Sequence, residues 1–364
     1  MPRRSSSCSR GTAPTRTWSM STAARTGAVT YPPLAEVLAA HGLTGAAEEP
    51  LQTDGWSGAR MTRLQRGDGA RFVLKRDSLD LDWIARETAD APELREAALA
   101  HAAPPLPGPV RLPHLGVGWD GDLVGMLMPD LSDALLRWEE LITGAQMDRV
   151  LAALGALHAE PWHLQLGPTF PWTDLRRRVL LLTRRSAATY EAAGNPVGQR
   201  FRQGWDAFDR HAPPAARALI DGLTANPEPL FAALAALPGA GLHGDLKLGN
   251  AALAPDGVVW LIDWQMTLVA PIAVELGWFL VCNVAGLPLP PDDVLEHYRV
   301  AADLPADDAW AKQRDLAIMI GLLLRGWRKG LDADAGLVAA CGWSAAEDIG
   351  WWGREAVAAA TRRL

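Results

Sequence analysis

The chain has 364 residues, a formal net charge of −7, and a composition that is 49% hydrophobic and 21% charged. The apolar fraction is too high for a disordered chain, and the length fits a globular protein of two lobes or two domains. Three scattered cysteines exclude a disulfide framework and a clustered thiolate zinc site. The acidic balance argues against nucleic acid as the main partner, and no apolar stretch is long enough for a membrane partner. We therefore expect a cytoplasmic globular protein, of an oligomeric state that the sequence does not indicate.

Residues 1–33 are expected to form a disordered extension. The first nineteen contain four arginines among Ser, Thr and Pro, without the apolar core of a signal peptide. Met20 opens a more ordinary composition. The segment is thus either a disordered extension or the product of a start codon placed too early.

Residues 34–130 are predicted to form a small α+β lobe, because short strand-like runs alternate with Gly and Asp turns. The expected elements are a helix at 34–43, strands at 61–64 and 71–75, a helix at 92–101, and a hairpin at 117–128.

Residues 131–364 are predicted to form a larger, mainly helical lobe with one strand-rich island at 241–264. The expected helices are 145–159, 175–193, 198–210, 213–223 and most of 292–364. The fold class is therefore α+β. A small antiparallel-sheet lobe followed by a large helical lobe that contains a hairpin resembles the bilobal architecture of protein kinases.

The strand-rich island holds the strongest candidate for a chemical site. The turn Ala254-Pro255-Asp256-Gly257 lies between two apolar runs, so a tight hairpin is expected. Antiparallel strands return to where they began, which places Asn250 beside Asp263, with Asp245 on the loop feeding the same edge. Carboxylate and amide oxygens suit Mg²⁺, and a carboxylate that stays off the metal can accept a proton from a hydroxyl.

The spacing His243-x-Asp245-(x)4-Asn250, followed by Asp263 after two apolar residues, is close to the protein-kinase catalytic loop. Protein kinases carry Arg where this chain has Gly244, and His-Gly-Asp resembles instead the aminoglycoside phosphotransferase and choline kinase-like superfamily of small-molecule kinases. This resemblance implies transfer of the γ-phosphate of ATP to a hydroxyl, with Asp245 as the catalytic base. It also implies that Asn250 and Asp263 hold Mg²⁺.

The resemblance also assigns roles to residues that lack a strong local pattern. Lys247 either contacts the transferred phosphate or points to solvent. The run from Gly55 through Ser57 to Gly58 resembles the hairpin that covers nucleotide phosphates, although an ordinary turn fits it equally well. Met128 falls at the junction of the lobes, where relatives offer backbone groups to the adenine.

Lys75 ends an apolar strand, as the phosphate-pairing lysine of kinases does. Such a lysine should pair with a glutamate on the next helix. Glu87, Glu93 and Glu96 are the candidates, and Glu96 best resembles the family's segment. We therefore expect Lys75 and Glu96 to serve the nucleotide.

The domain division that follows is an N-terminal nucleotide-binding lobe at 34–130 and a C-terminal catalytic and acceptor-binding lobe at 131–364. The expected acceptor is a hydroxylated small molecule such as an aminoglycoside, an amino alcohol or a sugar. Tryptophans and acids in the helical half give a slight preference for a cationic acceptor. The acids are Asp292, Asp293, Glu296, Asp307, Asp308, Asp332 and Asp334.

Two alternatives remain open. The first is a protein kinase, against which Gly244 and the lack of an Ala-Pro-Glu motif after Asp263 both count. The second is a non-catalytic nucleotide-binding scaffold of the same fold. A scaffold has no need to keep Lys75, Asp245, Asn250 and Asp263 together.

Overall fold

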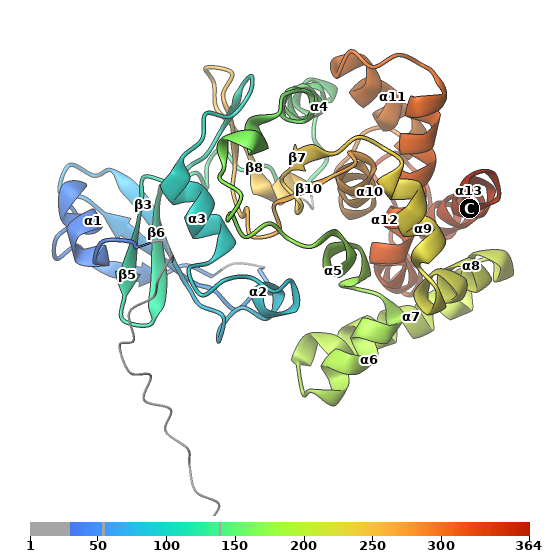
Figure 1. The fold of residues 1–364 in the computed structure, drawn as a ribbon, viewed down its shortest axis with the longest axis horizontal. Helices are drawn as coiled ribbons and strands as arrows, with labels where there is room; N and C mark the ends of the chain where they lie inside the picture. Colours follow the sequence, from blue (N-terminus) through green and yellow to red (C-terminus); the bar gives the residue numbers. More distant parts are fainter. Residues whose placement is uncertain (1–29, 53–54, 138–139) are drawn as a thin grey trace, which may run out of the picture. The chain divides into compact units, whose positions relative to one another are not determined.

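The folded part of the chain begins earlier than the sequence indicated. The computed structural model describes residues 30–52, 55–137 and 140–364, and residues 31–364 form one compact unit (Figure 1). Of the predicted extension at 1–33, residues 1–29 lie outside the described residues. Tyr31 is 3% exposed, and its hydroxyl donates to the Glu93 carbonyl oxygen. Residues 31–33 therefore belong to the fold, because Tyr31 packs in the core of the sheet lobe.

The sheet lobe is built on five antiparallel strands in the order β1-β2-β3-β6-β5. The strands are β1 (Glu48–Pro50), β2 (Arg60–Gln65), β3 (Arg71–Asp77), β5 (Gly116–Asp120) and β6 (Leu123–Pro129). Strand β3 lies in the middle of the sheet and is buried from Phe72 through Lys75. Helix α1 (Leu34–Ala40) contributes Leu34 and Val37 to one of the lobe's two small cores. The predicted strands and hairpins of this lobe are confirmed.

The helices of the sheet lobe differ from the prediction in two respects. The helix expected at 92–101 begins only at Arg95, as α3 (Arg95–Ala102), because Leu94 has a φ of 59° and leaves the helical region. A short helix, α2 (Trp83–Glu87), was not predicted. Its N-terminus is capped by the Asp82 side chain, which accepts from the backbone N–H groups of Ile84 and Ala85.

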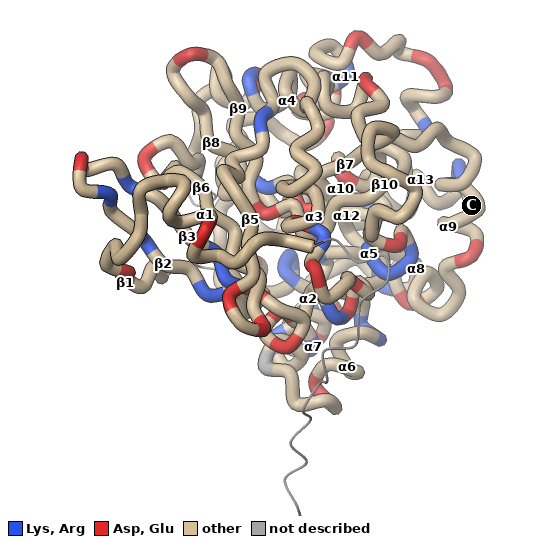
Figure 2. Tube along the Cα trace, turned by 60° about the vertical axis from the view of Figure 1, so that its left-hand side comes forward, with Lys and Arg blue, Asp and Glu red and all other residues tan. Residues whose placement is uncertain are grey.

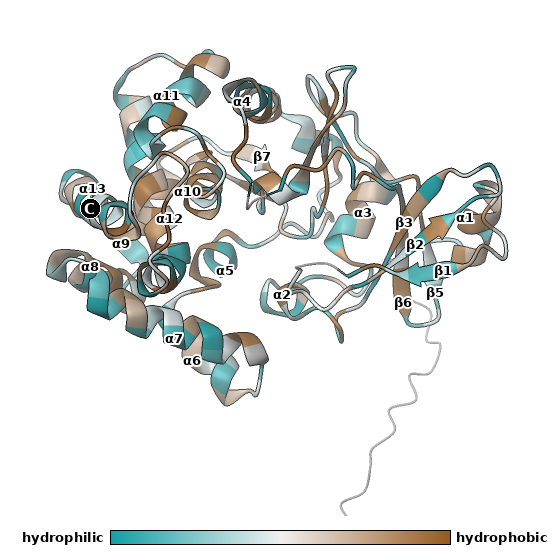
Figure 3. Cartoon of the chain, turned by 180° about the vertical axis from the view of Figure 1, so that it is seen from behind, coloured by the Kyte–Doolittle hydropathy of each residue, from teal (hydrophilic) through white to brown (hydrophobic). Residues whose placement is uncertain are grey.

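The helical lobe packs around one buried helix, α10 (Ala273–Cys282), every residue of which is buried. It packs against α12 (Asp308–Asp334), which also contacts α7 (Pro196–His211) and α13 (Ala345–Arg363). Figure 3 shows the central helices as mostly hydrophobic and the outer ones as mixed. The remaining helices are α4 (Gly144–Ala159), η1 (Trp162–Gln165), α5 (Leu175–Leu180), α6 (Arg184–Ala192), α8 (Pro214–Ala225), α9 (Glu228–Ala235) and α11 (Pro291–Ala301).

Most of the predicted helices of this lobe are present, but the one expected at 175–193 is divided into α5 and α6. Thr183 ends the connection between them, and its hydroxyl accepts from the Ser186 N–H to cap α6. Among the described helices none has both the length and the apolarity that crossing a membrane requires.

The strand-rich island forms two small sheets beside the helices. Strands β8 (Ala251–Leu253) and β9 (Val259–Leu261) make the predicted antiparallel hairpin, and β4 (Val110–Arg111) pairs with β9 in parallel. Strands β7 (Ala240–Leu242) and β10 (Leu268–Ala270) form a second pair. The loop from His243 to η2 (Leu248–Asn250) connects the two sheets. The predicted α+β class, with a small antiparallel-sheet lobe and a large helical lobe, is confirmed.

Candidate active site

Lys75 joins the two lobes through a buried ion-pair cluster. Its Nζ lies 2.6 Å from Glu96 Oε2 and 2.9 Å from Asp263 Oδ1. The pairing of Lys75 with Glu96, which the sequence favoured, is thus present in the structure. Burial lowers the pKa of Lys75, but the charges of Asp263 and Glu96 outweigh it and hold the pKa well above its usual value. The ammonium therefore stays charged next to Asp263.

The predicted hairpin is present, and the loop before it brings Asn250 into contact with Asp245. The Ile262 N–H donates to the Asn250 carbonyl oxygen at 3.0 Å, so Asp263 follows directly after the last paired residue. The Asn250 side-chain amide donates to the Asp245 carbonyl oxygen at 2.8 Å and lies 3.4 Å from its Oδ2. The return of the strands brings the start of the Asp263 segment back to Asn250, whereas the contact between Asn250 and Asp245 spans only five residues of the loop.

Lys247 ties the two carboxylates of the site together electrostatically. Its Nζ lies 3.2 Å from Asp245 Oδ2, and its side chain is 34% exposed. Burial lowers the pKa of Lys247, while the charges of Asp245 and Asp263 raise it to a net value above the usual one. Both carboxylates therefore act on one ammonium group, which lies beside Asp245. A contact of Lys247 with the transferred phosphate stays a prediction.

Asp245 is ionised and keeps one oxygen free. Burial raises its pKa, but the charges of Lys247 and Arg178 outweigh this effect and bring the pKa below its ordinary value. Its Oδ1 is buried and has no hydrogen-bond partner within the part of the chain that the structure describes. A buried, unpartnered carboxylate oxygen is costly unless something binds it, so this atom is positioned to accept a hydrogen bond from a ligand.

The loop that carries Asp245 is held by Glu275, a residue that the sequence analysis missed. Glu275 lies on α10 with no exposed surface. Its Oε1 accepts from the Gly244 N–H at 2.7 Å, and its Oε2 accepts from the His243 N–H at 3.0 Å. The Nε2 of His158, on α4, lies 3.0 Å from the same Oε2. A single buried carboxylate thus fixes two successive backbone groups of the loop.

His243 braces the loop through its ring. Its Nε2 lies 2.9 Å from the Ile262 carbonyl oxygen, and its Nδ1 accepts from the Asp245 N–H at 3.2 Å. Because the backbone amide can only donate, Nε2 carries the proton and donates to Ile262. The ring therefore links the loop of Asp245 to the strand end that precedes Asp263.

Gly244 is required by the conformation of the loop. Its φ is +84°, and a Cβ at this position would lie 1.9 Å from the Met266 carbonyl oxygen. Its own carbonyl oxygen accepts a hydrogen bond at 2.8 Å from Nε of Arg178. The Arg178 side chain lies on α5 and is fully buried. No side chain fits here, which gives a physical reason for glycine where protein kinases carry arginine.

The glycine-containing turn is attached to α2. Gly58 has a φ of +103°, and a Cβ there would lie 2.3 Å from the Leu81 carbonyl oxygen. The Trp83 N–H donates to the Ser57 carbonyl oxygen at 3.2 Å, and the Trp83 ring donates to the Trp56 carbonyl oxygen at 2.7 Å. A nucleotide role for Gly55, Ser57 and Gly58 stays a prediction. The same holds for Met128, which is buried and pairs with Val73 in the sheet.

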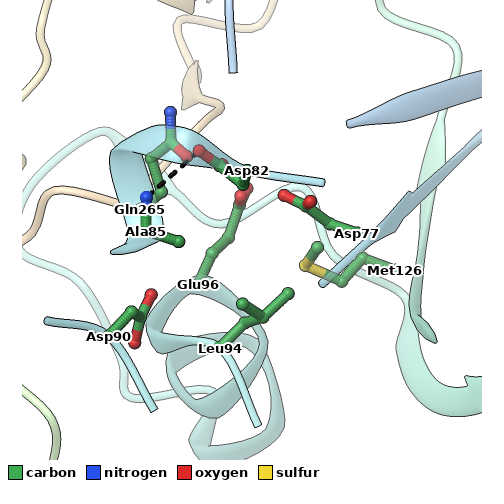
Figure 4. Close-up of a pocket in the computed structure, with 8 residues that line it drawn as sticks. All are labelled: Asp77, Asp82, Ala85, Asp90, Leu94, Glu96, Met126 and Gln265. Atoms are coloured by element: carbon green, nitrogen blue, oxygen red, sulfur yellow. Dashed lines mark hydrogen bonds between the residues drawn. The ribbon is translucent and has the colours of Figure 1, made fainter. Parts of the chain in front are cut away.

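A small acidic pocket lies next to the Lys75–Glu96 pair (Figure 4). It has a volume of about 10 Å³, room for roughly one water molecule. Its acids are Asp77, Asp82, Asp90 and Glu96. Burial, followed by the charge of Asp77, raises the pKa of Asp82 to about 8, so this carboxyl holds its proton near neutral pH.

A comparison of the sequence with known protein families also points to a phosphotransferase. A sequence profile of the phosphotransferase enzyme family matches residues 52–316, which is more than half of the chain. The chain belongs to this family. The predicted resemblance and the expectation of a phosphotransferase are therefore confirmed. No curated protein matches the chain.

Solved structures with a similar arrangement include several phosphotransferases. An aminoglycoside phosphotransferase from Alicyclobacillus acidocaldarius is 14% identical, with a TM-score of 0.47 over 89% of this chain and 91% of that one. A choline kinase from Cryptosporidium parvum is 10% identical, with a TM-score of 0.48 over 87% and 88% of the two chains. A macrolide 2′-phosphotransferase from Brachybacterium faecium is 17% identical, with a TM-score of 0.42 over 90% and 96%.

The predicted metal ligands are one amide and one carboxylate, a donor set that Mg²⁺ uses when phosphate oxygens fill its other positions. In the described part of the chain no three His, Cys, Asp or Glu residues are grouped to hold a metal. Asn250 and Asp263 supply only an amide and a carboxylate, and the Asp263 side chain is 25% exposed. Magnesium prefers such sites, with one or two protein ligands and the remaining positions filled by phosphate and water.

Proposed function

We propose that this phosphotransferase moves the γ-phosphate of ATP to a hydroxyl group of a small molecule, with Asp245 as the base. The observation that carries the proposal is the free, buried Oδ1 of an ionised Asp245, within one cluster with Asn250 and Lys247. An acceptor hydroxyl that donates to this atom is held in position for attack.

In the proposed reaction, the acceptor oxygen forms a bond to the γ-phosphorus while the bond from that phosphorus to the β,γ-bridging oxygen breaks. The hydroxyl proton passes to Asp245, and ADP leaves. Because the pKa of Asp245 lies below its ordinary value, with burial opposed by the charges of Lys247 and Arg178, the carboxylate is a weak base. Its main contribution is therefore orientation of the hydroxyl, as expected for phosphoryl transfer.

The surrounding residues position the nucleotide. Lys75, held by Glu96, would offer its ammonium to phosphate oxygens, and Lys247, which lies beside Asp245, would contact the transferred phosphoryl group. Asn250 and Asp263 would hold Mg²⁺, which neutralises phosphate charge when bound. Gly55, Ser57, Gly58 and Met128 complete the nucleotide side of the proposal.

The test separates binding from chemistry. Thermal stabilisation by ATP is measured with and without Mg²⁺, and ADP release is measured against a collection of hydroxylated metabolites and antibiotics. Asp245→Asn should keep the stabilisation and lose turnover by about 100-fold or more. The matched control is Asp256→Asn, at the exposed tip of the same hairpin.

The outcomes also decide the alternative of a non-catalytic scaffold. Stabilisation by ATP without any acceptor-dependent ADP release in the wild-type protein would favour the scaffold. Unchanged turnover in Asp245→Asn would contradict the assignment of the base.

A further inference from the structure

Six of the seven acids of the helical lobe that the sequence offered to a cationic acceptor are already engaged; the seventh is Asp293. Five form ion pairs with basic side chains of the protein, and a sixth, Asp307, caps α12 by accepting from the Trp310 N–H. Figure 2 shows acidic and basic residues interspersed along the trace. The pairs are Asp292–Arg314, Glu296–Arg299, Asp308–Lys312, Asp332–Arg328 and Asp334–Arg210. They give no reason to expect selection of a cation.

Arg178 is a buried cation that makes no ion pair with a carboxylate of residues 30–52, 55–137 or 140–364. Its Nε donates to the Gly244 carbonyl oxygen at 2.8 Å, in the loop that carries Asp245. Its two terminal nitrogens, Nη1 and Nη2, are buried and have no hydrogen-bond partner among the described residues. The guanidinium carbon lies 4.4 Å from the centre of the Trp278 ring. The positive charge is thus placed directly behind the catalytic loop.

Arg325 is a second cation on the same tryptophan, and it is partly exposed. Its guanidinium carbon lies 5.5 Å from the Trp278 ring and 5.6 Å from the Trp327 ring. Its Nη1 lies 3.3 Å from the Cys282 sulfur, a weak acceptor, and its buried Nε has no partner within the described ranges. No hydrogen bond of this guanidinium reaches a carboxylate in the described part of the chain.

The backbone of α12 is broken at Arg325. This residue has a φ of −133° and a ψ of 17°, whereas the helix continues on both sides from Asp308 to Asp334. A break inside a long helix has a local cause and is often found where a side chain serves a function. Here the break occurs at the residue whose guanidinium contacts Trp278 and Trp327.

Both guanidinium groups are linked to the loop of Asp245: they contact the Trp278 ring, and Arg178 donates to the Gly244 carbonyl oxygen, one residue before Asp245. Burial raises the pKa of the Cys282 thiol, and the charges of Arg325, Asp245, Lys247 and Arg178 all act on it. Lys247 is paired with Asp245, and Glu275 keeps its negative charge while it holds the loop. Among the described residues, the guanidinium groups of Arg178 and Arg325 are the ones beside this loop that make no hydrogen bond to a carboxylate. Buried or half-buried charges are normally paired, so these two groups call for an anion.

We propose that the acceptor is an anionic hydroxyl compound, whose carboxylate or phosphate group binds Arg325 while its hydroxyl faces Asp245. The proposal rests on the proposed function, since it names the substrate class of the same site. A guanidinium binds either anion with two parallel hydrogen bonds, which fixes the orientation of the acceptor. Arg178 acts as a positioning residue: it holds Gly244 and adds positive potential without touching the acceptor. This class replaces the cationic acceptor that the sequence favoured.

Two matched acceptor series test the charge of the substrate. One contains glucuronate, glucose 6-phosphate, glucose and glucosamine, and the other contains glycerate, glycerol 3-phosphate, glycerol and 2-amino-1,3-propanediol. Within each series the members share hydroxyl groups and differ mainly in charge. Binding of Mg²⁺ and ATP is first confirmed by thermal stabilisation, and ADP release is then measured with each compound.

The expected result is a kcat/KM for at least one acid that exceeds the values for its neutral and amine analogues by about 10-fold or more. The carboxylate and phosphate members distinguish the two sources of negative charge. Turnover of the neutral or amine members alone would overturn the inference and leave the proposed function intact. Failure of every acid in a protein that binds Mg²⁺ and ATP would also overturn it. Failure to bind ATP would contradict the proposed function itself.

Substitutions at Arg325 connect the preference to this residue. Arg325→Gln should lower kcat/KM for the acid by about 10- to 100-fold, the loss expected for a hydrogen-bonded charge, and leave the KM for ATP unchanged. Arg325→Lys should restore part of the loss because it keeps the charge. The control is Arg202→Gln, an exposed arginine of α7 that pairs with Glu191. Equal losses for acid and neutral acceptors in Arg325→Gln would show a merely structural role and refute the assignment.

Discussion

Replacement of Glu275 by glutamine tests how the catalytic loop is held. In the native protein Oε1 accepts from the Gly244 N–H, and Oε2 accepts from the His243 N–H and faces Nε2 of His158. The glutamine carbonyl oxygen can keep the two contacts of Oε2. Its NH₂ group then faces the Gly244 N–H, so two donors meet and neither is satisfied.

The magnitude follows from this single mismatch. A hydrogen bond to a charged acceptor contributes about 1.5 to 3 kcal/mol, and a buried unsatisfied donor costs about 1 to 3 kcal/mol. The two ranges overlap because they describe partly the same loss. We therefore expect Glu275→Gln to lower the free energy of unfolding by about 2 to 4 kcal/mol. We also expect kcat to fall by about 100-fold, since a shift of Asp245 by about 1 Å has an effect of that order.

Urea denaturation and steady-state kinetics measure the two effects. The control is Glu296→Gln, an exposed carboxylate on α11 that pairs with Arg299, which should change stability by less than about 1 kcal/mol. If Glu275→Gln matches this control in stability and matches the wild-type protein in kcat, the carboxylate does not hold the loop and the reasoning fails.

Three further predictions concern individual contacts. Gly244→Ala places a Cβ against the Met266 carbonyl oxygen in a residue with positive φ. The denaturation midpoint should therefore fall, by an amount that corresponds to a loss of about 3 kcal/mol or more in the free energy of unfolding. A midpoint equal to that of the wild type would contradict this. Lys75→Met leaves the buried Glu96 without its cation and should lower the free energy of unfolding by about 3 to 5 kcal/mol. The added substitution Glu96→Gln should restore part of this loss. A double variant no more stable than the single one would argue against the pair. Burial raises the pKa of Asp82 to about 8, above its value of about 4 in the unfolded chain, so its ionisation weakens the fold as pH rises through this window. Asp82→Asn keeps the helix cap without ionising, so its melting temperature relative to wild type should rise between about pH 4 and pH 8 and level off above this range. A constant difference from about pH 4 to pH 8 would show that the pKa of Asp82 is not raised in the folded protein.

Local sequence patterns predicted the part of the site that lies on one hairpin. The Pro-Asp-Gly turn and the flanking apolar runs were sufficient to predict the hairpin that returns the chain from Asn250 to the residue before Asp263, and the structure has this hairpin. The same patterns located the strands β2, β3, β5 and β6. They overestimated α3, because nothing in the alanine-rich run indicates the positive φ at Leu94. They also missed α2, which is only five residues long.

The contacts that hold or complement the loop come from distant elements. Glu275 is 32 residues from His243, and Arg325 is 43 residues from Cys282. In the sequence Glu275 is one acid in an apolar helix, and Arg178 is one of three successive arginines at 176–178. Arg178 differs from Arg176 and Arg177 only in that it is buried and they are exposed. That difference depends on which face α5 turns toward the catalytic loop.

The sequence by itself determined the family, the two-lobed α+β arrangement and the oxygen-bearing residues of the catalytic hairpin. Each of these depends on short-range spacing and on turn residues whose conformational preferences are intrinsic. The tertiary structure decided which glutamate pairs with Lys75, which carboxylate fixes the loop, and which cations lack a partner beside Asp245. Those outcomes depend on how buried helices pack against one another. Only that packing removes a charged side chain from water, and burial is what makes its pairing with a particular neighbour matter.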